Sequence, residues 1–273
     1  TALGTGGGIR NVYDKLRNDT VMVFNGDVLS GMDLEGILTT HHDKDADVTM
    51  HLLNVADPRA FGCVPTDSNG RVTAFLEKTE DPPTNQINAG CYVFKRSVIE
   101  SIPANRVVSV ERETFPGLLA EGRLVVGHVD NSYWRDMGRP DDFTRGSSDL
   151  VRGIAPSPLI EGKTGESLVD PSAGIAGGVL LLSGTAVGRG SEVGAGSRLE
   201  GTVVFDGVRI EPGAIIHNSI IASGAHIGAN AVIENCVIGE GAHIGARCEL
   251  LDGMRVFPGV SIPDAGVRFS SDA

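Results

Sequence analysis

The feature that most constrains the fold is a repeat in the second half of the chain. Aliphatic side chains recur there every five or six residues. The full set is Val187, Val193, Leu199, Val204, Ile210, Ile216, Ile221, Ile227, Ile233, Ile238, Ile244, Leu250, Val256 and Ile262. A hexapeptide period with aliphatic residues pointing inward is typical of a β-helix solenoid. An α-helix is excluded because its period does not match.

A second pattern supports this register. Leu199, Ile216, Ile233 and Leu250 are seventeen residues apart, so we expect them at equivalent places in successive coils. Two residues after them stand Gly201, Asn218, Asn235 and Asp252. These residue types tolerate a positive φ, which a tight corner can demand. The spacing therefore predicts one stacked corner per coil.

His226 and His243 are also seventeen residues apart, and we expect them to stack on one face. The same column continues back to Arg209 and Glu192, which favours a solvated ladder. Some β-helices are acyltransferases with a histidine base, so that class stays as an alternative, with His217 weighed in the same way. The favoured role for the solenoid is structural and oligomerising.

Composition bounds the function. Hydrophobic residues make up 41% and charged residues 21% of the 273 residues, as in ordinary soluble globular proteins. A formal net charge of −12 argues against a general nucleic-acid surface, which must be basic. No membrane-spanning stretch or signal-peptide pattern is found, so we expect a cytoplasmic protein. The scattered cysteines fit buried free thiols, and they are Cys63, Cys91, Cys236 and Cys248.

The first half alternates predicted strands and helices, which indicates an α/β domain. Its organising segment is the apolar run 21–24, which we expect to be a strand of a parallel sheet, buried on both faces and followed by Asp27 at its carboxyl end. The glycine-rich segment 4–8 predicts a turn ahead of a helix that begins at Ile9. His41 and His42 fall in the last turn of a predicted helix 34–42, where we expect them at the surface.

Polar residues follow several predicted strands of this half: Asp27, Glu77, Lys78, Asn88 and Asp136. Two isolated carboxylates suit Mg²⁺, which completes its octahedron with water and phosphate oxygens. A single lysine suits a phosphate as a point charge, while Glu and Asn suit sugar hydroxyls. Each residue alone is more often a turn or a solvated charge, so the set matters more than its members.

Residues 1 to about 150 resemble the sugar-1-phosphate nucleotidylyltransferases, and among them most closely the mannose-1-phosphate guanylyltransferases. The motifs are Leu3-Gly4-Thr5, Asn25-Gly26-Asp27, Phe61-Gly62-Cys63-Val64, Phe75-Leu76-Glu77-Lys78, Asn88-Ala89-Gly90-Cys91-Tyr92-Val93-Phe94 and Trp134-Arg135-Asp136-Met137-Gly138. Six motifs in the family's order are specific together, although each is weak alone.

The resemblance implies the roles. Gly4 and Thr5, with Asp27, would bind the nucleotide, and Asp27 and Asp136 would hold Mg²⁺. The sugar-binding set would be Gly62, Glu77, Lys78, Asn88 and Gly90, with Lys78 neutralising the sugar phosphate. Asp27, Lys78 and Asp136 would be catalytic. The implied reaction forms GDP-mannose and pyrophosphate from GTP and mannose 1-phosphate, in a homo-oligomer assembled through the β-helix.

The implied architecture is a Rossmann-like nucleotidyltransferase domain over residues 1–152, a linker over 153–166 and a left-handed β-helix over 167–273. The family's glycine-rich nucleotide loop has no match here, so we expect an N-terminally incomplete domain and weigh an inactive fragment. The alternatives are another nucleoside-diphosphate-sugar pyrophosphorylase, a non-catalytic regulatory subunit and, last, a β-helix acyltransferase.

Overall fold

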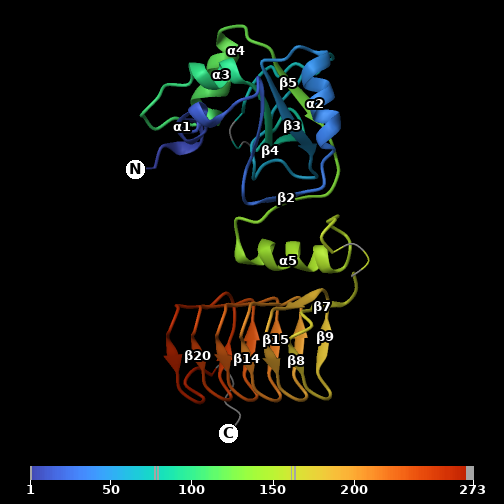
Figure 1. Cartoon of the computed structure of the whole chain (residues 1–273), viewed down its shortest axis with the longest axis vertical. Coiled ribbons are helices and arrows are strands. Elements are labelled where there is room, and N and C mark those ends of the chain that lie inside the picture. The colour runs from blue at the N-terminus through green and yellow to red at the C-terminus, as the bar shows by residue number, and fades with distance from the viewer. Residues whose placement is uncertain (1, 77, 79, 161, 163, 269–273) are drawn as a thin grey trace. The chain divides into compact units, whose positions relative to one another are not determined.

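The computed structural model describes residues 2–76, 78, 80–160, 162 and 164–268. The chain packs as two compact units, Thr1–Trp134 and Arg135–Ala273 (Figure 1). The domain boundaries predicted from the sequence, at residues 152 and 166, stay a prediction.

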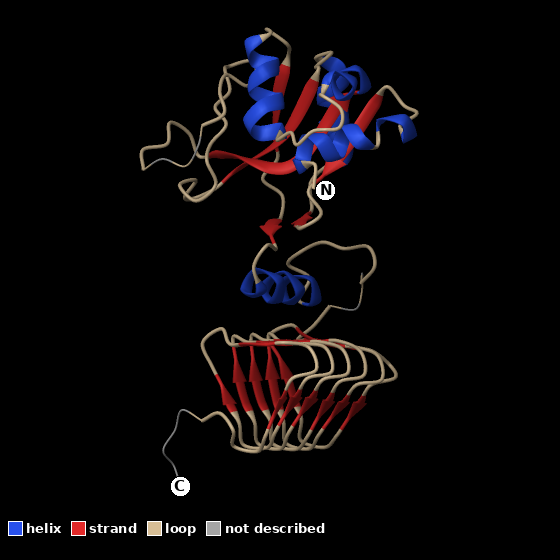
Figure 2. Cartoon of the chain, turned by 90° about the vertical axis from the view of Figure 1, so that its left-hand side faces the viewer, coloured by secondary structure: helices blue, strands red, loops and turns tan. Residues whose placement is uncertain are grey.

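The first unit is built on a four-stranded mixed sheet. Its strand order is β1 (Thr20–Phe24), β4 (Gln86–Lys95), β3 (Val48–Asn54) and β5 (Val125–Val129). β4 runs antiparallel to β1 and β3, and only β3 and β5 are parallel. Helix α2 (Leu34–Asp43) covers one face, whereas α1 (Gly4–Asn11), α3 (Arg96–Ser101) and α4 (Phe115–Ala120) lie on the other side (Figures 1 and 2). The predicted α/β layering is confirmed.

Three short helical or extended segments complete this unit. They are the 3₁₀ helix η1 (Tyr13–Lys15), the strand β2 (Val28–Ser30) and the π-helix η2 (Val110–Thr114). The strand β6 (Trp134–Asp136) runs across the boundary between the units.

The strands that are buried on both faces are β3 and β4, not β1. Tyr92 and Phe94 pack into the core that also holds Phe115, while the alternate residues Cys91 and Val93 pack with Ile37 of α2. β1 instead lies at the sheet edge and pairs antiparallel with β4. The side chain of Phe24 is 53% exposed. The prediction of a doubly buried parallel strand is therefore wrong, because an apolar run does not say which strands flank it.

Helix α2 begins where the sequence predicts. Asp33 Oδ1 accepts hydrogen bonds from the backbone N–H groups of Glu35 and Gly36, at 3.1 and 3.0 Å. The surface prediction for His41 is wrong, because only 2% of this residue is exposed and its Nδ1 lies 2.9 Å from Thr49 Oγ1. His41 follows Ile37 by four residues and so shares its buried helix face. His42 is exposed, as predicted.

The predicted glycine-rich turn is also wrong, since these residues form α1 itself. The helix begins at Gly4 and ends at Asn11. A Cβ on Gly7 would lie 2.6 Å from the carbonyl oxygen of Arg106, and the Gly6 N–H donates to the Val108 carbonyl at 2.8 Å. Glycine is needed here because the helix lies directly against a neighbouring backbone, which leaves no room for a side chain.

The second unit contains α5 (Pro140–Val151) and a parallel β-solenoid of about six turns, consistent with the left-handed β-helix expected from the sequence. Each of its three sheets stacks equivalent strands from successive coils (Figure 2). The first sheet contains β7 (Ser167–Val169), β10 (Thr185–Val187), β13 (Val203–Val204), β16 (Ile220–Ile221), β19 (Val237–Ile238) and β22 (Arg255–Val256). The second contains β8 (Gly174–Ile175), β11 (Glu192–Val193), β14 (Arg209–Ile210), β17 (His226–Ile227), β20 (His243–Ile244) and β23 (Ser261–Ile262). The third contains β9 (Leu180–Leu182), β12 (Arg198–Glu200), β15 (Ile215–His217), β18 (Val232–Glu234) and β21 (Glu249–Leu250).

The predicted register of the solenoid is confirmed. Leu199 pairs with Ile216, Ile216 with Ile233, and Ile233 with Leu250, and all four are fully buried. The predicted corners have positive φ values of 52° at Gly201, 43° at Asn218, 54° at Asn235 and 54° at Asp252. The sequence pattern therefore fixed both the inward column and the corner of each coil.

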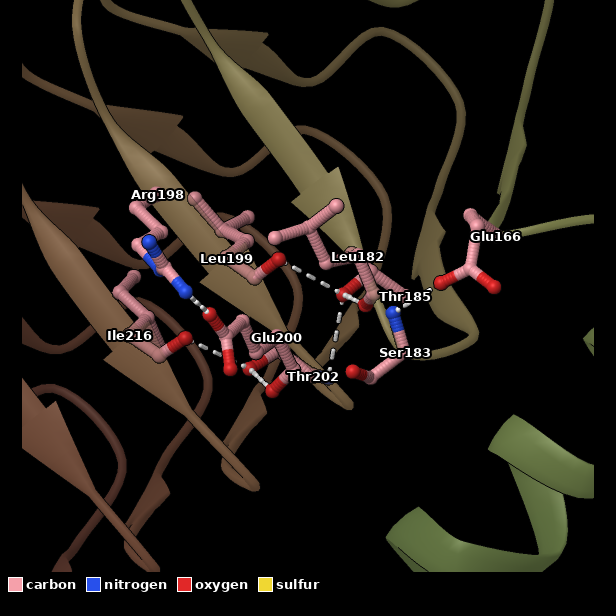
Figure 3. Close-up of polar contacts among 9 residues, drawn as sticks. All are labelled: Glu166, Leu182, Ser183, Thr185, Arg198, Leu199, Glu200, Thr202 and Ile216. Carbon is pink, nitrogen blue, oxygen red and sulfur yellow. Dashed lines mark hydrogen bonds and ion pairs between the residues drawn. The ribbon is translucent and has the colours of Figure 1, made fainter.

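A column of small side chains, which was not predicted from the sequence, accompanies the aliphatic column of the solenoid. One such column contains Thr185, Thr202, Ser219 and Cys236, each two residues before an inward aliphatic residue. Thr185 Oγ1 lies 2.8 Å from the Leu182 carbonyl oxygen and 3.1 Å from that of Leu199 (Figure 3). These hydroxyls satisfy buried carbonyl groups and so link neighbouring coils.

Candidate active site

A cavity of about 640 Å³ opens beside β1 in the first unit. It is lined by the whole apolar run 21–24 and by the turn that carries Asp27. Thr5 and Ile9 of α1 line it from another direction, together with Tyr92 of β4. Two of the predicted nucleotide-binding residues, Thr5 and Asp27, are therefore brought to one cavity.

The start of α1 is held in place by residues 108–110, which lead into η2. The backbone N–H of Val110 donates to Thr5 Oγ1 at 2.9 Å. Gly4 has a φ of +70°, and a Cβ there would lie 2.6 Å from the Val108 carbonyl oxygen. A side chain at position 4 would push α1 away from this segment, so glycine is required to keep Thr5 at the cavity.

A second cavity, of about 490 Å³, lies in the same unit and contains three of the predicted sugar-binding residues: Gly62, Lys78 and Asn88. The side chain of Lys78 is exposed to this cavity. Glu111 and Arg112 of η2 contribute further charged groups. The lining therefore combines an ammonium group, a carboxylate and an amide, which can bind a phosphorylated sugar.

Asn88 is fixed in one orientation by its neighbours. Its Nδ2 donates to Tyr92 Oη at 2.7 Å and to Glu111 Oε1 at 3.2 Å, while its Oδ1 accepts from the backbone N–H of Gly90 at 3.1 Å. Both amide protons are thus used, and Oδ1 keeps one lone pair. Asn88 is consequently set to accept a hydrogen bond from a ligand hydroxyl group.

Tyr92 joins the two linings, because it lines the first cavity and its hydroxyl group contacts Asn88 in the second. Burial raises the pKa of Tyr92, so the hydroxyl group stays protonated at neutral pH. Tyr92 and Glu111 were not predicted from the sequence to be site residues. Tyr92 could have been predicted, since residues 88, 90 and 92 alternate along one strand and must share a face.

Gly90 shapes the backbone between the cavities. Its φ is +80°, and a Cβ there would lie 2.8 Å from Asn25 Nδ2. Its carbonyl oxygen accepts a hydrogen bond from the Asn25 N–H at 2.7 Å, which anchors the turn that leads to Asp27. Gly90 therefore positions that turn.

Two further residues were predicted to belong to the site. Glu77 lies outside the described residues. Asp136 belongs to the second unit, where its Oδ1 accepts a hydrogen bond from the Gly138 N–H at 2.8 Å. Their roles stay predictions.

The family resemblance implies a divalent metal, and the carboxylate chemistry here fits one. Asp27 is exposed and, within the described part of the chain, has no hydrogen bond or ion pair. Its oxygens are ligands of the type that hard cations prefer. Among the described residues, no group of three or more His, Cys, Asp or Glu side chains is placed to hold a metal ion. A site of one or two carboxylates completed by substrate oxygens is compatible with that finding.

None of the helices in the described part of the chain has both the length and the apolar character needed to cross a bilayer. All four cysteines are free and buried, as predicted.

Comparisons with known proteins identify the family of the chain. The family described as nucleotidyl transferase matches residues 1–153, and the GMPPB C-terminal domain matches residues 163–266. A mannose-1-phosphate guanylyltransferase of Mycobacterium tuberculosis is 65% identical over 99% of this chain and 76% of its own length. Mannose-1-phosphate guanylyltransferase 1 of Arabidopsis thaliana is 35% identical over 72% of this chain and 56% of its own length.

A mannose-1-phosphate guanyltransferase of Neurospora crassa is 34% identical over 63% of this chain and 50% of its own length. The chain thus spans about three quarters of the mycobacterial relative and about half of the other two. Because a family domain matches more than half of it and a relative matches nearly all of it, this chain belongs to the nucleotidyl transferase family, as a homologue of the mannose-1-phosphate guanylyltransferases.

Proposed function

We propose that this chain transfers a guanylyl group from GTP to mannose 1-phosphate, forming GDP-mannose and pyrophosphate. A phosphate oxygen of the sugar phosphate attacks the α-phosphorus of GTP in line with the leaving pyrophosphate. Little covalent chemistry is required of the protein in such a transfer, so positioning and charge neutralisation supply most of the rate.

The observation that carries this proposal is the hydrogen bond between Asn88 and Tyr92, which links the linings of the two cavities. One cavity holds the predicted nucleotide residues and the other the predicted sugar residues. Two substrates bound side by side across this contact would be held as one reacting pair, which is the main requirement of a two-substrate phosphoryl transfer.

Each residue then has a physical role. Lys78 neutralises the sugar phosphate, because an ammonium group is a suitable point charge for it. Asn88 accepts a hydrogen bond from a sugar hydroxyl group, and Gly62, Glu77 and Gly90 complete the sugar site. Gly4 and Thr5 contact the nucleoside. Asp27 and Asp136 hold Mg²⁺, which when bound offsets negative charge on the α-phosphate.

The test is pyrophosphate release with GTP, mannose 1-phosphate and MgCl₂, run beside UTP with glucose 1-phosphate. Asp27→Asn should lower turnover at least a hundredfold with little change in thermal stability, because Asp27 is exposed and unpaired among the described residues. The matched control is Asp14→Asn, another exposed aspartate of the first unit. Full turnover in Asp27→Asn would remove the metal role, and preference for UTP would favour another nucleotide-sugar synthesis.

We further propose that the protein works in the cytoplasm as a homo-oligomer joined through the β-helix. Four buried free thiols support a reducing compartment. The exposed aliphatic side chains of Leu180 and Ile215, on the outward face of the third solenoid sheet, support a contact there. Light scattering of the wild type and of Ile215→Asp decides the matter, since a mass unchanged by the substitution contradicts this contact.

A further inference from the structure

The outward face of the second solenoid sheet contains a histidine pair that guanylyl transfer does not use. His226 in β17 and His243 in β20 are register partners in adjacent coils, as the sequence predicts. Their Nδ1 atoms are 2.8 Å apart, and their ring centroids are 4.5 Å apart with an angle of 62° between the planes. Both rings reach the surface, so a solute ion has access to them.

A carboxylate fixes one ring of the pair. Glu211 Oε1 lies 3.2 Å from His226 Nε2 and 3.0 Å from Arg209 Nε. A carboxylate can only accept here, so neutral His226 carries its proton on Nε2 and leaves Nδ1 with a free lone pair on the side of His243. This carboxylate–imidazole contact is the arrangement that orients metal-binding histidines in proteins.

We propose that Nδ1 of His226 and Nδ1 of His243 together bind one late first-row divalent cation, Ni²⁺ or Cu²⁺, between two coils of the solenoid. Metal–imidazole bonds of about 2.0–2.1 Å place two nitrogens about 2.9 Å apart at 90° and about 3.3 Å apart at a tetrahedral angle. The observed 2.8 Å fits the 90° arrangement. Octahedral and square-planar sites have that angle, which favours Ni²⁺ and Cu²⁺ over tetrahedral Zn²⁺.

Binding requires one proton to move within His243. Its proton leaves Nδ1 for Nε2, which frees a second lone pair beside the first. Water fills the remaining coordination positions, since the pair supplies two ligands only. The site is unlike the proposed magnesium site, because imidazole nitrogen is a poor ligand for Mg²⁺.

The surrounding charges favour a cation. Glu211 contacts His226, and Arg209, the next residue of the column, lies 3.0 Å from Glu211 and 4.0 Å from Glu192 one coil further on. With both histidines neutral, these three groups carry a net charge of −1. The next residue of the column beyond His243 is the uncharged Ser261, so the described column adds no further positive charge.

The experiment is calorimetric titration of the untagged full chain with NiCl₂ at pH 7.5. We expect one saturable site in the wild type and at least tenfold weaker binding in His226→Gln and in His243→Gln. Glu211→Gln should weaken binding ten- to a hundredfold, the range found when such orienting carboxylates are lost. His42→Gln, an exposed histidine of the first unit, is the matched control and should bind as the wild type does.

Two further readouts separate this site from adventitious binding. Binding should weaken between pH 7.5 and pH 5.5, because the metal competes with protons for both imidazoles. With CuCl₂, electron paramagnetic resonance should show two coordinating nitrogens in the wild type and one in His243→Gln. No saturable binding in the wild type, or equal affinity in the His226→Gln/His243→Gln double variant, would overturn the proposal.

Discussion

Mild acid should destabilise the first unit through His41. This side chain is buried between α2 and β3, and burial lowers its pKa from 6.5 to about 4. The neighbouring His42 and Lys95 act in the same direction, whereas Asp45 and Asp47 oppose it. The folded state therefore holds His41 neutral over a pH range in which the unfolded chain binds a proton.

The sign and size follow from proton linkage. The unfolded state binds more protons than the folded state between pH 6.5 and pH 4, so the free energy of unfolding falls as pH falls through this window. Each pH unit costs about 1.4 kcal/mol, which gives a loss of about 2 kcal/mol at pH 5 relative to pH 7.5. Burial also lowers the pKa of His51. Protonation of His51 in the unfolded chain therefore adds to the loss of stability at low pH.

The assay is urea unfolding at pH 7.5, 6.5, 5.5 and 5.0, followed by tryptophan fluorescence. Trp134 is the only tryptophan of the chain, and its Nε1–H donates to the Ala89 carbonyl oxygen at 2.9 Å, so it reports on the first unit. His41→Gln keeps a polar group near Thr49 and removes the titration, which should reduce the pH-dependent loss by about 2 kcal/mol. His243→Gln, which changes an exposed histidine of the second unit, is the control and should keep the wild-type pH dependence. A His41→Gln protein that loses as much stability as the wild type would refute the reasoning.

Three other substitutions test the fold and the site. Ile216→Ala should cost about 3 kcal/mol in thermal unfolding followed by circular dichroism, because it leaves a cavity in the solenoid core, whereas the outward Ile215→Ala should cost less than 1. Asn218→Ala should cost about 1–2 kcal/mol at a corner with φ of +43°, and Asn218→Gly should be close to neutral; equal costs would exclude strain as the cause. Gly90→Ala should displace Asn25 and lower the rate of pyrophosphate release roughly tenfold, which corresponds to about 1.4 kcal/mol of activation free energy. An unchanged rate there would mean that the turn is not positioned by Gly90.

The solenoid was predictable because its determinants are local and repeated. Ile216 and Asn218 recur in kind every seventeen residues, so the pattern alone placed them inward and at a corner. The hydroxyl column of Thr185 and Thr202 was equally present in the sequence, two residues before the aliphatic positions, but only the buried carbonyls that it satisfies explain it (Figure 3).

The first unit was less predictable because its decisive contacts are non-local. The edge position of Phe24 follows from strand order, which no run of apolar residues specifies. The burial of His41 follows from the sheet beneath α2. At the site, the motif residues were identified one by one, yet the hydrogen bonds of Asn88 with Tyr92 and Glu111 join a strand to a segment more than twenty residues away. The family resemblance identified the residues of the site, whereas the packing of the fold determines how they are arranged.

The coils of the solenoid are not all the same length. Leu199 pairs with Leu181 eighteen residues before it, and Ile238 pairs with Val256 eighteen residues after it, whereas the coils between them use seventeen. An added residue is therefore taken up at a turn without disturbing the stack of interior side chains. A single insertion or deletion at such a turn is therefore compatible with an intact solenoid core.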